Sequence, residues 1–125
     1  MPLLVEIDHQ KRFVTITATG LVVLQDILDY FDRLIAGNAM PYPKLFDARS
    51  CEASFSDQDI RIVGAKMLVY AAYDPRGPVA MVAPKGAMQD LLRSFLAAAG
   101  PSERPAMIFD RLEDAHGWLL AFPMR

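Results

Sequence analysis

The chain has 125 residues, of which 53% are apolar and 22% are charged, a composition that can bury a hydrophobic core and argues against disorder. Its 13 basic and 15 acidic residues are interspersed and give a formal net charge of −2, which argues against binding to nucleic acid through phosphate neutralisation. Cys51 is the only cysteine, which excludes an internal disulfide, a thiolate zinc site and a CxxC redox pair and favours a reducing compartment.

The first 20 residues predict a β-hairpin. Residues 3–8 and 13–19 both look extended, and in the second segment apolar residues alternate with threonines. The polar residues 9–12 between them are too few for a crossover, so the two strands must run antiparallel.

The middle of the chain predicts helices and strands in alternation. Residues 24–36 carry an apolar stripe at helical spacing, and Gly37 follows as a stop signal. Residues 43–47 predict a short strand, and residues 48–55 predict an irregular segment. A helix is then expected from Ser56 to about Tyr73, because Ser56 precedes acidic residues in the manner of a capping box.

The last third of the chain continues this alternation after a turn at residues 74–78. Residues 79–83 form an unbroken apolar run, which is typical of a strand that is covered on both faces. A helix is expected at residues 86–99, ended by Gly100 and Pro101, and a strand at residues 106–109. A final helix is expected through Leu120, with Asp110 as its cap.

The resulting order is β-β-α-β-α-β-α-β-α. Alternating strands and helices predict right-handed βαβ crossovers. The sequence therefore predicts an α/β two-face sandwich, in which four helices pack on a five-stranded, mostly parallel sheet with a hairpin at its edge. Residues 1–125 are expected to form a single domain, since no linker or internal repeat interrupts this order.

Four local phrases in this order resemble the SpoIIAA-like branch of the STAS superfamily. They are residues 5–9 (VEIDH), 44–47 (KLFD), 76–80 (RGPVA) and 108–119, which contain IFD followed by EDAHGWL. The resemblance covers nearly the whole chain and implies the fold of anti-sigma-factor antagonists, with a more distant likeness to CRAL-TRIO lipid carriers. None of the phrases is a catalytic signature, so they indicate a fold rather than an activity.

In STAS regulators, an Asp-Ser pair after the third strand carries a phosphorylated serine. Here Asp47 matches the aspartate, but Ala48 follows it and the loop is longer. Ser50, Ser54 and Ser56 remain chemically possible phosphoacceptors. For Ser56, the competing interpretation is an ordinary helix N-cap, and a phosphate there would face repulsion from neighbouring acids.

A second candidate site lies at the carboxyl ends of the predicted parallel strands, where ligands tend to bind in such sheets. Lys85 and Gly86 begin a helix and could hold an anion there, with Asp47 and Asp110 on the same rim. The competing interpretation is a solvated lysine, because a lone Lys-Gly lacks the glycine spacing of a phosphate loop.

The sequence shows no catalytic or metal-binding constellation. His9 and His116 have no further ligand at recognisable spacing, and the chain contains no GxSxG elbow. We therefore expect neither an enzyme nor a metal nor a cofactor.

The helix expected at residues 56–73 is apolar nearly all the way round, so it must be covered on more than one side. Three explanations stay open: a helix wedged between the sheet and a neighbouring element, a homodimer face, or the wall of an apolar pocket. Its candidate interface or pocket residues are Val63, Met67, Tyr70 and Tyr73.

The leading functional hypothesis is a non-catalytic regulatory or protein-interaction module of STAS-like type, which binds a protein partner, with a homodimer as a further option. The alternative is a carrier or sensor of a small apolar or amphipathic ligand. A cytoplasmic location is expected, because neither a signal peptide nor a run of about 18 uncharged apolar residues occurs.

Overall fold

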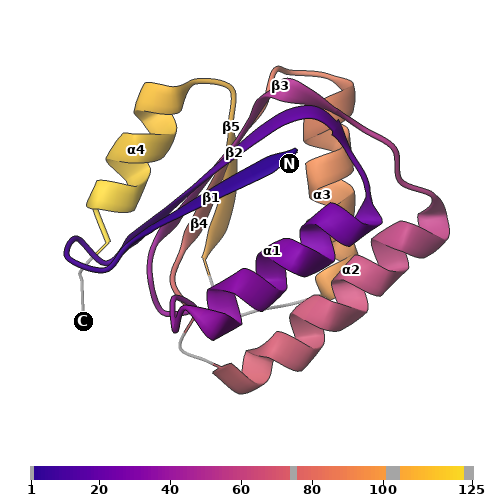
Figure 1. Ribbon diagram of the computed structural model, residues 1–125. Helices are drawn as coiled ribbons and strands as arrows, with labels where there is room; N and C mark the ends of the chain where they lie inside the picture. The colour runs from indigo at the N-terminus through magenta and orange to yellow at the C-terminus, as the bar shows by residue number, and fades with distance from the viewer. Residues whose placement is uncertain (1, 74–75, 101–104, 123–125) are drawn as a thin grey trace.

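The computed structural model describes residues 2–73, 76–100 and 105–122, without the side chains of Ala71 and Tyr73. These residues form one five-stranded sheet with the order β1-β2-β3-β4-β5. Figure 1 shows α1, α2 and α3 on one face of the sheet and α4 on the other. The predicted α/β sandwich with four α-helices is therefore confirmed.

The elements follow the predicted order, with one short 3-10 helix (η1) in addition. In chain order they are β1 (Leu3–Asp8), β2 (Phe13–Val22), α1 (Leu24–Ala36), β3 (Lys44–Ala53), α2 (Asp57–Val69), η1 (Tyr70–Tyr73), β4 (Val79–Val82), α3 (Ala87–Ala99), β5 (Ala106–Phe109) and α4 (Leu112–Leu120).

The register of the sheet confirms the predicted mixture of pairings. β1 and β2 are antiparallel, with Glu6 opposite Thr15 and Asp8 opposite Phe13. β2, β3, β4 and β5 are parallel to one another. Because neighbours in the sheet are also neighbours along the chain, α1, α2 and α3 each lie between two adjacent parallel strands, and α4 follows the last strand.

The core has two unequal parts, one on each face of the sheet. The larger cluster lies under α1, α2 and α3 and includes Val14, Ile16 and Phe31. The smaller cluster joins α4 to the sheet through five buried residues: Leu45, Ala80, Val82, Ala115 and Leu119. Since α4 packs on β3, β4 and β5, the outer face of β1 and β2 has no helix over it among the described residues.

The predicted ends of two strands are wrong. β2 continues through Gly20, which has a φ of +66°, to Val22. β3 continues to Ala53, so most of the segment at residues 48–55 that was expected to be irregular is strand. The extension of β3 is mostly polar and lacks the alternation of apolar and polar residues that marks a strand, so the sequence does not predict it. Its pairing with the end of β2 stabilises it.

Two helix boundaries also differ from the prediction. The helix expected to reach Tyr73 ends as an α-helix at Val69, and its last turn has 3-10 geometry. The turn expected at residues 74–78 includes Asp74 and Pro75, which lie outside the described residues. Arg111, and not Asp110, is the N-cap of α4, and the Asp110 carboxylate lies 3.5 Å from the ammonium group of Lys85.

Helix α2 packs chiefly on α3. The two helices approach so closely that a Cβ atom added at Gly64 would lie 2.7 Å from the backbone of Ala98. On the outer side of α2, Leu68 and Val69 are 56% and 64% exposed. Among the described residues, no element covers Leu68 and Val69, while the other side of α2 faces α3 and the sheet side of the fold; the three explanations for this apolar helix stay open.

Candidate functional site

An apolar cavity of about 80 Å³ lies between the sheet and helices α1, α2 and α3. Nineteen residues line it, and none of them carries a charge. They come from β2, β3 and β4, from the three helices, and from the segment that joins β3 to α2. The described residues thus line a partly open space that suits an apolar molecule better than water.

Small side chains form part of the cavity floor. Ala18 of β2 and Ala48 of β3 are both almost fully buried and both line the cavity. Phe46 lies on the central strand β3, yet its side chain is partly exposed. Because a central residue on a covered sheet face is normally buried, this exposure indicates that solvent can reach the floor of the cavity.

A β-bulge in β3 directs two residues into the cavity. Thr17 pairs with Asp47 and Thr19 pairs with Ser50, so β3 contains one residue more than β2 over this interval. Ala48 and Cys51 are three positions apart and would point to opposite faces of a regular strand. The extra residue brings both to the cavity.

Asp47 and Arg49 hold this bulge in place. The Asp47 carboxylate accepts hydrogen bonds from the backbone amide of Arg49 at 3.1 Å and from its guanidinium group at 2.9 Å. These hydrogen bonds, chiefly the one from the side chain, lower the pKa of Asp47 despite its partial burial. The residue that matches the aspartate of the STAS pattern therefore has a structural role here.

The cavity wall on the helix side contains flexible and partly exposed residues. Met67 of α2, and Met88 and Leu91 of α3, are each partly exposed and line the cavity. Phe55 packs edge-on against Phe95, with ring centroids 5.1 Å apart. Because methionine side chains adapt easily to the shape of a neighbour, this wall can adjust to a bound molecule.

Cys51 also faces the cavity and is half-buried. Burial raises the pKa of its thiol, and the negative charge of Asp47 raises it further. Since only the thiolate is a good nucleophile, Cys51 is a poor candidate for a reactive cysteine.

The four residues predicted on α2 and η1 lie in different surroundings. Val63 is buried and Met67 is partly buried, and both line the cavity. Tyr70 is buried against α1, with its ring 5.1 Å from that of Phe31. The side chain of Tyr73 lies outside the described residues. That these residues form a dimer face stays a prediction.

The three candidate phosphoacceptor serines are all exposed, but they differ in role. Ser56 is the N-cap of α2: its hydroxyl accepts a hydrogen bond from the Asp59 amide at 3.1 Å, and the Asp59 carboxylate accepts one from the Ser56 amide at 3.0 Å. Ser50 belongs to strand β3, and Ser54 follows that strand. Their phosphorylation stays a prediction.

The charged residues of the predicted anion site at the strand ends form two ion pairs, and the binding of an anion there stays a prediction. Lys85 pairs with Asp110 while its side chain stays 83% exposed, and Asp47 pairs with Arg49. Gly86 is the N-cap of α3, with a φ of +121°. An anion at this rim would therefore compete with the Asp110 carboxylate for the ammonium group of Lys85.

The two histidines lie in separate surroundings. His9 Nδ1 is 2.8 Å from the Tyr42 hydroxyl, and His116 lies edge-on to Phe13 with ring centroids 6.0 Å apart. Within residues 2–73, 76–100 and 105–122, no group of three His, Cys, Asp or Glu side chains is placed to hold a metal ion.

In the same part of the chain, no helix has the length and apolar character that crossing a membrane requires.

The sequence predicts the wall of an apolar pocket as one of three explanations for α2, but it does not predict the other walls of the cavity. Small residues at positions 18, 48 and 53 on neighbouring strands were the available signal, because they leave space that Phe55 and Met88 only partly fill. That signal depends on the bulge, which the sequence did not predict.

No protein family model and no curated protein matches this sequence. Among solved structures, the chain is similar to an uncharacterised protein of the DUF3478 family with a SpoIIAA-like fold, from Shewanella loihica PV-4. The TM-score is 0.57 at 18% identity, over 94% of this chain and 91% of that chain. At this identity the likeness shows the fold alone, which is the one that the sequence resemblance implied.

Proposed function

Starting from a SpoIIAA-like fold, we propose that this protein binds a small apolar molecule in the cavity between the sheet and α1, α2 and α3, and that it acts as a carrier or sensor of that molecule. The observation that carries the proposal is the uncharged lining of the cavity. Charged groups would have to give up water to approach such a surface, whereas an apolar molecule gains free energy by entering it.

The size of the cavity restricts the ligand. A cavity of about 150 Å³ with a similar lining is known to bind benzene, and this one measures about 80 Å³. A ligand of benzene size or larger must therefore move the cavity wall. We expect Met67 and Met88 to move first, since both are flexible and partly exposed.

The same movement gives a route from binding to signalling. Helix α2 is held mainly by α3 and presents Met67 to the cavity. A ligand that displaces Met67 would therefore shift α2 and its exposed Leu68 and Val69. A change in this surface on binding is what a sensor requires.

Toluene is a suitable probe, followed by NMR of the methionine methyl groups in the full chain. Met67, Met81 and Met88 line the cavity, whereas Met107 lies on β5 and is 48% exposed. We expect saturable shifts at the first three methyl groups and none at Met107. Equal shifts at all four, or none at the cavity methionines, would contradict the proposal.

A matched pair of variants tests the cavity directly. Ala48→Leu adds three carbon atoms where the Ala48 side chain meets the cavity, whereas Ala97→Leu adds them on the exposed side of α3. We expect Ala48→Leu to weaken toluene binding about tenfold or more, equivalent to about 1.4 kcal/mol, and Ala97→Leu to leave it unchanged. If Ala48→Leu folds poorly, Ala53→Leu places the same atoms at the edge of the cavity and serves instead.

The single cysteine gives an independent measurement without any substitution. Because Cys51 lines the cavity, a bound ligand should slow its alkylation by N-ethylmaleimide. Native mass spectrometry of the freshly purified protein adds a search for a retained molecule. Protection of Cys51 by toluene supports the cavity as the site, and an unchanged rate counts against it.

A non-catalytic regulatory module of STAS-like type remains the second proposal, because the fold is shared with a SpoIIAA-like protein. It predicts a protein partner that binds through an exposed surface and requires no cavity ligand. Incubation with cell extract and ATP, followed by phosphosite mapping, tests its switch. Absence of phosphate at Ser50, Ser54 and Ser56 would remove the support for a phosphorylated antagonist.

A further inference from the structure

A second, polar groove lies on the opposite face of the sheet, between α4 and the β1–β2 hairpin. It measures about 530 Å³, which is within the range of about 300–1,000 Å³ that is usual for small-molecule sites. It exists because α4 packs on β3, β4 and β5 and leaves the outer face of β1 and β2 uncovered. The apolar cavity described above is on the other side of the sheet and shares no lining residue with this groove.

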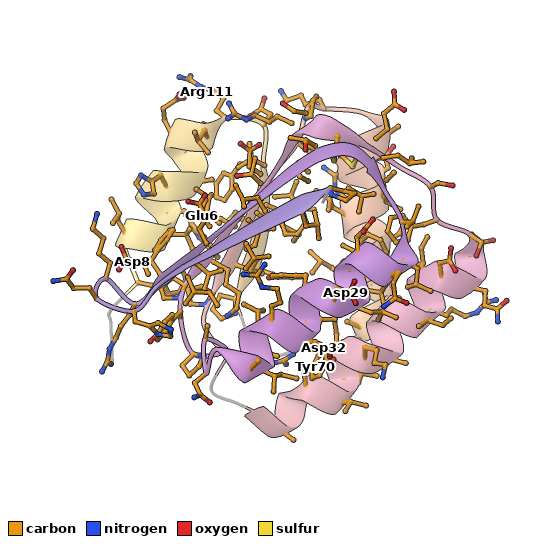
Figure 2. The ribbon with its side chains drawn as sticks, viewed as in Figure 1. Glu6, Asp8, Asp29, Asp32, Tyr70 and Arg111 are labelled. Atoms are coloured by element: carbon orange, nitrogen blue, oxygen red, sulfur yellow. The ribbon has the colours of Figure 1, made fainter. Side chains whose placement is uncertain are left out.

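One wall of the groove is acidic. Glu6 and Asp8 alternate along β1 and therefore point to the same face, and both line the groove. Figure 2 shows them along β1 between the hairpin turn and α4. Asp8 is fixed in place, since its carboxylate accepts hydrogen bonds from the backbone amides of Gln10 and Lys11 at 3.0 and 2.9 Å.

The Glu6 side chain differs from that of Asp8, because its carboxylate has no hydrogen bond or ion pair with any described residue. Lys11 also lines the groove, at the hairpin turn, so two carboxylates face one ammonium group. The charge of the groove, with neutral histidine, is therefore negative, and a cation is the ligand that would complement it.

Apart from Thr15 and His116, the rest of the groove is apolar. Phe13 on β2, with Leu119 and Leu120 on α4, lines it, and Leu120 is 72% exposed. His116 lies edge-on to Phe13 on the same side. An acidic wall beside an apolar wall fits a molecule that has a charged end and an apolar body.

From this arrangement we propose that the groove binds a small amphipathic amine, with its ammonium group at Glu6 and Asp8 and its apolar body against Phe13 and the last turn of α4. The positive end gains electrostatic attraction at the acidic wall, and the body buries surface that Leu120 now exposes. This inference is independent of the proposed apolar cavity ligand.

The test uses phenethylamine and its uncharged analogue 2-phenylethanol, followed by amide NMR of the full chain. We expect phenethylamine to bind in the millimolar range and to shift the amides of Glu6, Thr15 and His116. The alcohol, which has the same body and no charge, should bind more weakly. Equal binding of the two compounds, or shifts centred on Met67 and Met88, would overturn the proposal.

Charge variants give effects of opposite sign, which loss of folding could not produce. Glu6→Gln should weaken phenethylamine binding about two- to fivefold, and Lys11→Gln should strengthen it by a similar factor, because the repulsion is removed. Glu52→Gln is the matched control, since Glu52 is an exposed glutamate on β3 outside the groove. If Glu6→Gln and Glu52→Gln bind phenethylamine equally well, the acidic wall is not the recognition element.

Discussion

Two glycines that lie inside helices should respond in opposite ways to the same substitution. Gly64 of α2 faces α3, and a Cβ atom there would lie 2.7 Å from the Cβ, carbonyl carbon and carbonyl oxygen of Ala98. Gly117 of α4 has open space, with no atom within 4 Å of such a Cβ. Substituting alanine at each position therefore compares helix propensity with and without a steric conflict.

The magnitudes follow from these surroundings. Alanine stabilises the interior of a helix by about 0.5–1 kcal/mol relative to glycine, and Gly117→Ala should show this gain. At Gly64 the same gain is opposed by overpacking against the backbone of Ala98, which costs about 1–3 kcal/mol. The two variants should then differ in free energy of unfolding by about 1–3 kcal/mol, with Gly64→Ala the less stable.

Chemical denaturation with urea measures both variants, and thermal unfolding supplies a check. For a chain of this size, 1 kcal/mol corresponds to about 3–5 °C in Tm. Gly64→Ala should also speed the reaction of Cys51 with N-ethylmaleimide, because moving α2 away from α3 opens the cavity that Cys51 lines. If Gly64→Ala stabilises the protein as much as Gly117→Ala does, the close contact between α2 and α3 is refuted.

Three further substitutions and one control test local features by denaturation. Ser56→Ala removes the cap of α2 and should cost about 1 kcal/mol, whereas the exposed Ser54→Ala should change stability by less than about 0.5 kcal/mol. Lys44→Met should cost about 1–3 kcal/mol, because Lys44 is 1% exposed and its ammonium group donates to two backbone carbonyls. Asp47→Asn tests the lowered pKa of Asp47, which stabilises the fold above the ordinary aspartate value of about 3.9. The difference in stability from the native protein should be fully present at about pH 6 and should shrink as the pH falls below the ordinary aspartate value, and a difference that is constant with pH would contradict this reasoning.

Elements with one strong local signal could be predicted from the sequence. The helix at Leu24–Ala36 and the strands at Leu3–Asp8 and Ala106–Phe109 have the predicted bounds. Each carries its own pattern: an apolar stripe, a short extended run before a polar turn, or an apolar run that ends at an acidic residue. The alternation of strands and helices then restricts the sheet to a mostly parallel arrangement.

Features that depend on distant residues could not be predicted. The second half of β3 contains Arg49, Ser50 and Glu52, which carry little strand signal, and it is extended because it pairs with the end of β2. Asp110 looks like a helix cap in the sequence, but its carboxylate lies beside the ammonium group of Lys85, which is 25 positions earlier in the chain. Which β3 side chains point into the cavity likewise depends on the β-bulge, and this bulge is defined only by the pairing of β3 with β2.

The limited burial of α2 connects stability with the proposed binding function. This helix buries Val63 and Gly64 but leaves Leu68 and Val69 exposed, and its main neighbour is α3. Segments with few buried apolar contacts open at lower free energy than the rest of a protein. A molecule in the cavity would add apolar contacts beneath α2, so amide exchange in this helix should slow with ligand while exchange in β2 and β4 stays nearly constant. Carrier and sensor functions both require this difference, because the cavity must open locally while the sheet keeps its structure.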